Sequence, residues 1–222
     1  SDTGNVRLSS LFHLTDYLSL TVDPSFQYVL ANGGGYTALS ETDQRLRGRA
    51  AFAGVDLNGD GDPDTAYVIA SEDRRTLHVL LRIHGRGVQT HRPAGELILP
   101  EAPLGPASLS IANGVLKVED LSGGTTAISS TYRYRLAPKT GQMRLIGLDA
   151  TLYSRTFAHD GFEMSWNLLT GAIITRVLAL DEGGDDAAYT PKFEQRAKRP
   201  SAPIAMKDTP DPEMIMDDLR KK

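Results

Sequence analysis

The stretch DLNGDGDPD, residues 56–64, carries four carboxylates and one side-chain amide within nine positions. It lies between the apolar run 51–55 and the strand-like run 65–70, so the pattern predicts a loop that joins two strands. Carboxylates this close repel one another strongly unless a cation lies among them. Oxygen-bearing side chains at loop positions one, three, five and nine, a backbone carbonyl at position seven and a glycine at position six fit a calcium-binding loop. We therefore expect a site for a hard cation.

The stretch is not a complete EF-hand loop. Its twelfth position, where that loop has a bidentate glutamate, is Tyr67, and the flanking residues favour strands over helices. The alternative interpretation is an acidic turn, rich in aspartate and glycine, that binds no metal.

The loop and its two flanking strands resemble a known family. DLNGDGDPD, followed by TAYVIA (65–70) and later by LHVLLRI (77–83), resembles the calcium loop of FG-GAP and VCBS-type β-propeller repeats, where the loop joins two strands of one blade. The motif occurs once in this chain, whereas a propeller usually repeats it. The resemblance implies bound Ca²⁺, held by the side chains of Asp56, Asn58, Asp60 and Asp64 and by the backbone carbonyl of Asp62.

Composition excludes several classes of protein. The chain has 222 residues, a net charge of -4 and no cysteine. The net charge argues against a nucleic-acid binder, which would need a basic stripe, and without cysteine the chain has neither disulfides nor thiolate metal sites. No apolar run approaches the roughly 18 residues of a membrane helix. The first residues show no signal-peptide pattern, and we treat the chain as a trimmed mature form whose precursor could carry a signal or a lipid anchor.

Motifs of common enzyme classes are missing from the sequence. The histidines lack the spacing of zinc ligands, no GxSxG nucleophile motif occurs, and the glycine-rich segments lack the lysine of a phosphate-binding loop. Glutamates are scattered as in any chain of this length, so they do not single out a glycosidase pair. We expect the protein not to be an enzyme.

Short alternating runs separated by turns every 8–12 residues predict an all-β fold of antiparallel meanders and hairpins. The arrangement expected is propeller-like, and the alternative is a two-sheet β-sandwich. We expect one β domain over residues 1–180, followed by an extended segment over 181–222 with a short terminal helix that starts at Asp211-Pro212-Glu213. Further expectations are a strand at 36–39, a charged connection at 41–49, a segment at 85–106 with only 96–99 as strand, and a loop at 121–127.

A second informative stretch is SGGTTAISSTYRYR, residues 122–135. Its pattern predicts a flexible, hydroxyl-rich loop that leads into a strand with two tyrosines on one face and two arginines on the other. Tyrosine and arginine are common anchors of protein interfaces, so the stretch suits insertion into a partner's cleft. The alternative is that Tyr132 and Tyr134 pack inward, Arg133 and Arg135 are solvated, and the loop is a plain connection.

SSTYRYRL (129–136), followed by GQMRLIGLD (141–149) and SWNLLTG (165–171), is similar to bacterial periplasmic lysozyme inhibitors and to immunity proteins against secreted lysozyme-like effectors. In inhibitors of the invertebrate-type lysozyme, a protruding loop with a Ser-x-x-Tyr motif enters the active-site cleft, and Ser129 and Tyr132 match that spacing. With the acidic loop included, the chain is most similar to calcium-binding immunity proteins paired with type IV secretion peptidoglycan hydrolases. The resemblance implies that Ser129 and Tyr132 enter the cleft and that Arg133 or Arg135 strengthens the contact. The run at Ser122 and Gly123 is an alternative key loop.

The sequence thus predicts a periplasmic β protein, stabilised by calcium, that blocks a lysozyme-like glycoside hydrolase. A calcium-dependent adhesion or scaffold module without an enzyme target is the alternative. A third, less favoured alternative is a carbohydrate-active enzyme with an unrecognised carboxylate pair.

Overall fold

The computed structural model divides the chain into two units, Ser1–Thr37 and Ala38–Lys222. It describes the backbone of residues 3–7, 10–15, 18–22, 25–29, 50–70, 74–85, 88–181 and 188–221. Side chains are described for residues 56–70, 74–83, 90–180 and 189–221. The strand predicted at 36–39 and the connection predicted at 41–49 lie outside these residues.

The first unit contains two small antiparallel sheets. In one, β1 (Thr3–Arg7) pairs with β4 (Ser25–Val29). In the other, β2 (Ser10–Thr15) pairs with β3 (Leu18–Val22). The alternation at 18–22 and from residue 26 onward therefore predicts strands correctly.

The second unit begins with a four-stranded antiparallel sheet in the order β5-β6-β7-β8. Its strands are β5 (Ala50–Val55), β6 (Asp64–Ala70), β7 (Arg75–Gly85) and β8 (Val88–Ile98). The acidic stretch at 56–64 connects β5 to β6, as the sequence predicts. Strand β8 occupies a segment that we expected to be mostly loop because of its glycines and prolines. Its Pro93 lies opposite Leu80 at a register shift, and β8 is an edge strand, so the missing N–H of proline is tolerated there.

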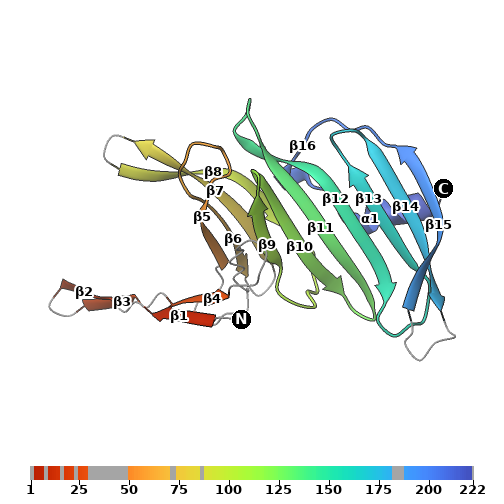
Figure 1. Ribbon diagram of the computed structural model, residues 1–222, viewed down its shortest axis with the longest axis horizontal. Helices are drawn as coiled ribbons and strands as arrows, with labels where there is room; N and C mark the ends of the chain where they lie inside the picture. The colour runs from red at the N-terminus through yellow and green to blue at the C-terminus, as the bar shows by residue number, and fades with distance from the viewer. Residues whose placement is uncertain are drawn as a thin grey trace. The chain divides into compact units, whose positions relative to one another are not determined.

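The larger sheet has eight strands and follows the path β15-β14-β13-β12-β11-β10-β9 (Figure 1). Strand β16 (Ile204–Ala205) pairs with one part of β12. The other strands are β9 (Ser108–Ala112), β10 (Val115–Gly123), β11 (Thr126–Ala137), β12 (Gln142–Ser154), β13 (Gly161–Asn167), β14 (Ala172–Asp181) and β15 (Ala188–Lys198).

The turns between these strands follow the sequence signals closely. Asn113 and Gly114 connect β9 to β10 with φ angles of 52° and 68°, which is the geometry of the expected type I′ turn. Gly171, with φ 71°, lies in the turn from β13 to β14. The loop predicted at 121–127 is much shorter than expected, because β10 runs to Gly123 and β11 begins at Thr126.

One hydrophobic cluster serves both sheets of the second unit. It includes Leu77 and Val79 of the smaller sheet together with Leu116, Tyr134 and Leu148 of the larger one. Strand β8 also contacts β12 and the 3-10 helix η2 (Met206–Asp208). The contact is tight, since a Cβ at Gly95 would lie 2.5 Å from Met206 Sδ and 3.0 Å from Met143 Cβ.

The chain ends in helix α1 (Pro212–Arg220), which confirms the expected terminal helix. Asp211 caps it by accepting a hydrogen bond from the backbone N–H of Glu213 at 2.8 Å, and Pro212 takes the first helical position. Ile215 and Met216 are buried in the shared core, so the helix docks on its own domain. None of the helices in the described ranges is long and apolar enough to cross a membrane.

The all-β, antiparallel class predicted from the sequence is confirmed. Within the described residues both sheets are open, and neither closes on itself or forms a propeller. The expected boundary at residue 180 does not match the division of the chain, which falls between Thr37 and Ala38. The extended segment expected after residue 180 includes an edge strand of the large sheet over residues 188–198, with Pro191 next to a register shift between Val177 and Leu178.

Candidate functional site

The acidic loop is organised around the carboxylate of Asp56. Its Oδ1 accepts the backbone N–H groups of Asn58 at 3.1 Å and Gly59 at 2.6 Å, and its Oδ2 accepts that of Gly61 at 2.8 Å. Both glycines have positive φ, 83° and 88°, as the sharp turn requires. The hydrogen bond from Gly61 is the largest cause that lowers the pKa of Asp56.

Asp64 ties the end of the loop to the neighbouring strand. It is the first residue of β6 and has 0% of its surface exposed. Its Oδ2 accepts the N–H of Leu57 at 2.8 Å, and its Oδ1 accepts the N–H of Arg82 on β7 at 2.9 Å. Burial raises the pKa of this carboxyl, and the negative charges of Asp60 and Asp56 act in the same direction. Asp64 therefore connects the loop to β7, one oxygen bonding to each, although burying its charge is unfavourable.

The middle of the loop is exposed and hydrogen-bonded within itself. Asn58 Oδ1 accepts the N–H of Asp60 at 2.9 Å, and Asn58 Nδ2 donates to Asp60 Oδ2 at 2.7 Å. Asp60 Oδ1 accepts the N–H of Asp62 at 2.9 Å. An open hollow of about 470 Å³ beside these side chains is also lined by Arg82 and Arg92.

The donor chemistry of the loop fits Ca²⁺, because carboxylate, amide and carbonyl oxygens are the ligands this ion prefers. Each carboxylate oxygen has more than one acceptor site, so the backbone bonds to Asp56 and Asp64 leave capacity for an ion. In the described part of the chain, however, no three His, Cys, Asp or Glu side chains converge as a metal-binding group. Binding would require Asn58 and Asp60 to exchange their mutual hydrogen bond for contacts with the ion.

Strand β11 carries most of the residues predicted to bind a target, and they divide between its two faces. Ser129 and Arg135 are exposed, and Arg133 is half-buried beside Asp149, to which it donates. Asp149 also accepts from Ser165 Oγ at 2.7 Å. These residues lie on the solvent face of the large sheet, which confirms that the arginines occupy one face and the tyrosines the other.

Tyr132 points into the core. It is 2% exposed and lies 6.4 Å from Tyr134, centroid to centroid, and burial raises the pKa of both phenols. The hydroxyl groups of Tyr134 and Thr209 form a hydrogen bond of 2.9 Å. In this position Tyr132 cannot enter a partner's cleft. The structure instead agrees with the alternative in which Tyr132 and Tyr134 both pack inward. Its neighbours Ser129 and Arg133 lie in the middle of a paired strand rather than in a protruding loop.

Ser122 and Gly123 end strand β10 at the tip of the β10–β11 hairpin. Ser122 is buried, whereas Gly123 adopts φ 108°, and a Cβ there would lie 2.4 Å from Thr126 O. Gly123 therefore has a backbone role: it lets the chain turn within Gly124 and Thr125. Its N–H also donates to Ala102 O at 3.0 Å.

A second hairpin tip lies beside the first, between β12 and β13 at residues 155–160. The two are joined by backbone bonding, since Arg155 N donates to Thr125 O at 2.8 Å. Thr126 Oγ1 and His159 Nε2 are 2.9 Å apart, which adds a side-chain contact. We call the exposed part of these tips, residues 124–126 and 155–160, the hairpin end; it occupies the lower end of the large sheet in Figure 1.

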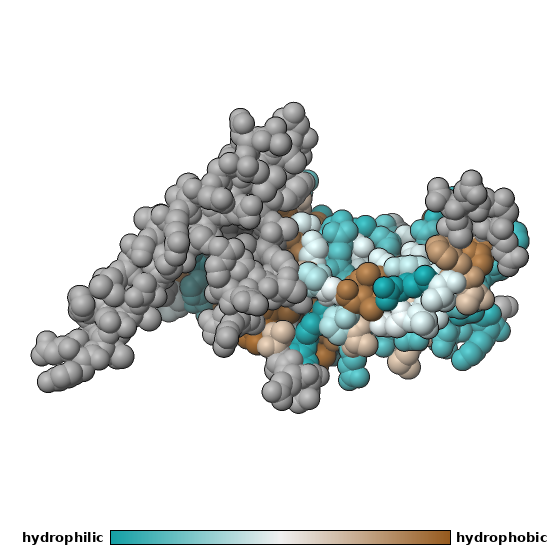
Figure 2. Space-filling view, turned by 90° about the horizontal axis from the view of Figure 1, so that it is seen from below, coloured by the Kyte–Doolittle hydropathy of each residue, from teal (hydrophilic) through white to brown (hydrophobic). Residues whose placement is uncertain are grey.

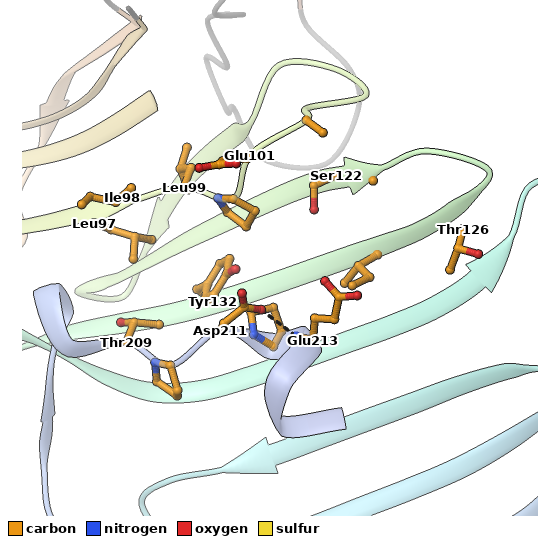
Figure 3. A pocket seen from close by; sticks show the side chains of 16 residues that line it. Leu97, Ile98, Leu99, Glu101, Ser122, Thr126, Tyr132, Thr209, Asp211 and Glu213 are labelled. Carbon is orange, nitrogen blue, oxygen red and sulfur yellow. Dashed lines mark hydrogen bonds between the residues drawn. The ribbon is translucent and has the colours of Figure 1, made fainter. Parts of the chain in front are cut away.

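An open pocket of about 570 Å³ lies next to the hairpin end, between the large sheet, the end of β8 and the start of α1 (Figure 3). Ser122 and Thr126 line it at the side of the tip, and Tyr132 forms part of its wall. Three carboxylates, those of Glu101, Asp211 and Glu213, also line the pocket, and it has no basic lining residue. Asp211 is committed to its helix-capping bond (Figure 3).

The exposed surface offers separate apolar positions rather than one apolar face. The face shown in Figure 2 is mainly polar over the described residues, with separate hydrophobic patches. The large hydrophobic side chains that are exposed among the described residues are Ile83, Ile98, Phe157, Leu169, Phe193 and Met214. Phe157 belongs to the hairpin end.

Comparison of the chain with models of protein families, with curated proteins and with solved structures gave no match.

The sequence did not point to Arg155, Phe157 or Tyr189, although the hydroxyl of Tyr189 supports the tip at 155–160 by donating to His159 O at 2.9 Å. The segment YSRTFAHDG, residues 153–161, separates two strand-like runs, and an aromatic residue within such a turn was the available signal. Tyr189 lies on β15 and reaches this turn only because of the order of the strands in the sheet. Periodicity in the sequence does not reveal that order.

Proposed function

We propose that this protein is a non-enzymatic inhibitor of a lysozyme-like peptidoglycan hydrolase, acting in the periplasm as an immunity protein. The observation that carries the proposal is the hairpin end, where two neighbouring tips are bonded to each other through Arg155 N and Thr125 O. A surface that is already ordered loses little conformational entropy when it enters a partner's cleft.

The chemistry of the hairpin end suits the cleft of such a hydrolase. Glycoside hydrolases use a pair of carboxylates around the scissile bond. Arg155 is exposed and offers a guanidinium to a carboxylate, although its Nη1 also donates to Gly124 O at 3.4 Å. Thr125 and Thr126 are exposed and offer hydroxyls, and Gly124 leaves room for close approach. In this proposal the target-binding role expected for Ser129 and Tyr132 passes to the tips, as the alternative at Ser122 and Gly123 anticipates.

Calcium has a structural role in the proposal. Asp56, Asn58, Asp60, Asp62 and Asp64 would hold it. A bound divalent cation supplies positive charge that offsets the repulsion among the carboxylates. The loop residues then keep β5, β6 and β7 in register, because Asp64 bonds to both the loop and Arg82 N.

For the arrangement of the sheets, the shared core supports an open two-sheet sandwich over a propeller. Residues of both sheets belong to one hydrophobic cluster, and β8 lies against β12. A propeller would instead place repeated small sheets around an axis.

A cell-wall turbidity assay tests the proposal. Purified chain, with Ca²⁺ present, is added to invertebrate-type, chicken-type and goose-type lysozymes and to any peptidoglycan hydrolase encoded beside its gene. Suppression of lysis by at least one enzyme supports an inhibitor. Lysis by the chain alone indicates an enzyme, and the absence of both effects favours the adhesion or scaffold module.

A further inference from the structure

Phe157 has an unusual backbone conformation for its residue type. Its φ is 54°, and among the described residues only Ala102 and Asn113 share positive φ without being glycine. Asparagine tolerates this region because its short polar side chain bonds locally, whereas a bulky side chain there is strained. Strained residues persist where the surrounding structure holds them, and they are often found at functional sites.

The surrounding turn holds Phe157 from both sides. The Oγ of the buried Ser154 accepts the N–H of Ala158 at 2.9 Å, and Phe157 N donates to Ser154 O at 3.4 Å. The hydroxyl of Tyr189 accepts the N–H of Ser154 at 2.8 Å and lies 2.9 Å from His159 O. The turn is thus fixed to β15 as well as to its own strands.

Burial of the Phe157 side chain does not offset the strain in its backbone. Phe157 is 48% exposed, and its aromatic neighbour is Tyr189, with ring centroids 6.4 Å apart and planes tilted by 33°. The turn therefore holds a half-exposed aromatic side chain in a fixed position beside Tyr189. The same hairpin end carries Arg155, whose Nη1 donates to Gly124 O at 3.4 Å, and the Thr126–His159 contact.

We propose that Phe157 is the anchor of the hairpin end and that it enters the apolar part of a partner protein's substrate cleft. This inference rests on the proposed function and names the residue that makes the contact. Substrate clefts are lined mainly by apolar and aromatic side chains with a few polar groups, so a half-exposed aromatic ring held in a fixed position complements the apolar lining of such a cleft. Rigid aromatic anchors flanked by polar contacts commonly dominate the binding energy of an interface.

The test uses three variants of the full chain. Phe157→Ala removes the ring, and Phe157→Gly removes the ring and also the strain of positive φ. Leu169→Ala is the matched control: Leu169 is 54% exposed and lies in the β13–β14 turn, at the opposite end of the sheet. Inhibition is measured in the turbidity assay with the enzyme that the wild-type chain inhibits best, and melting temperature is measured in parallel.

We expect both Phe157 variants to raise the half-inhibitory concentration at least about tenfold. Leu169→Ala should leave it unchanged, and Phe157→Gly should melt at or above the wild-type temperature. Unchanged inhibition by Phe157→Ala would overturn the anchor role while leaving the proposed function intact. A lower melting temperature for Phe157→Gly would show that the ring has a packing role. If the wild-type chain inhibits none of the enzymes, the proposed function is wrong, and the anchor role of Phe157, which depends on it, is wrong as well.

Discussion

Arg75 and Asp120 form a buried, two-pronged ion pair that joins the two sheets of the second unit. Arg75 Nη1 and Nη2 donate to the two carboxylate oxygens of Asp120 at 2.8 and 3.0 Å, and Nη2 also donates to Pro100 O at 2.9 Å. The guanidinium belongs to β7 and the carboxylate to β10, so the pair crosses from one sheet to the other.

Removing one partner of this pair should be strongly destabilising, because the other charge is left buried without compensation. We expect Arg75→Met or Asp120→Asn to lower the free energy of unfolding by about 3–5 kcal/mol. Urea denaturation measures the change. The double variant Arg75→Met/Asp120→Leu should recover part of the loss, and wild-type stability in either single variant would contradict the role assigned to the pair.

Calcium should stabilise the fold before it affects any binding surface. We expect the melting temperature to rise with added Ca²⁺ and to fall with a chelator, and Asp60→Ala should abolish the difference. The physical reason is that an ion bound to the folded state alone shifts the unfolding equilibrium. Glu101→Ala, a carboxylate outside the loop, is the control and should respond to Ca²⁺ like the wild type. An equal melting temperature with and without calcium would favour the metal-free acidic turn.

Tyr132→Ala should unfold the protein more easily rather than weaken inhibition alone. The side chain is 2% exposed in the shared core, and truncating a buried aromatic residue costs about 3–5 kcal/mol. Thermal melting measures the loss, and Arg135→Ala, an exposed change on the other face of β11, should have little effect. A Tyr132→Ala protein that melts like the wild type but no longer inhibits would restore the cleft-entering role.

Gly95 should not accept a side chain, because β8 crosses β12 and η2 at close range there. We expect Gly95→Ala to lower stability by about 1–3 kcal/mol through overpacking against Met206 and Met143. Gly124→Ala is the matched control, since a Cβ at that position meets no atom within 4 Å. Calorimetry compares the two, and equal melting temperatures would mean that the methionines move aside freely.

Local features were readable from the sequence where one short segment decides them. The turn at Asn113 and Gly114, the positive φ of Gly61 and the cap at Asp211 depend on a few adjacent residues. The period of two also assigned the tyrosines and arginines of β11 to opposite faces. It did not reveal which face is covered, because that depends on β8, η2 and α1, which are distant in the sequence.

The segments that were predicted wrongly are those whose structure depends on pairing with strands distant in the sequence. Prolines led us to treat the segments of β8 and β15 as loops, yet Pro93 and Pro191 lie on edge strands at register shifts, where a ladder N–H can be absent. The hairpin end was missed for a similar reason. Ser154 and Tyr189 meet only after β12, β13, β14 and β15 have assembled side by side.

Strand β15 has a consequence for the behaviour of the protein at high concentration. Among the described residues it pairs with β14 alone, so its other side presents eleven residues of sheet edge to solvent. Pro191 lacks a donor, the strand shifts register beside it, and Lys192, Glu194, Arg196 and Lys198 place charged side chains along the strand. These features oppose edge-to-edge stacking of one copy on another. The β15 edge of this open eight-stranded sheet is thereby protected against polymerisation into fibres.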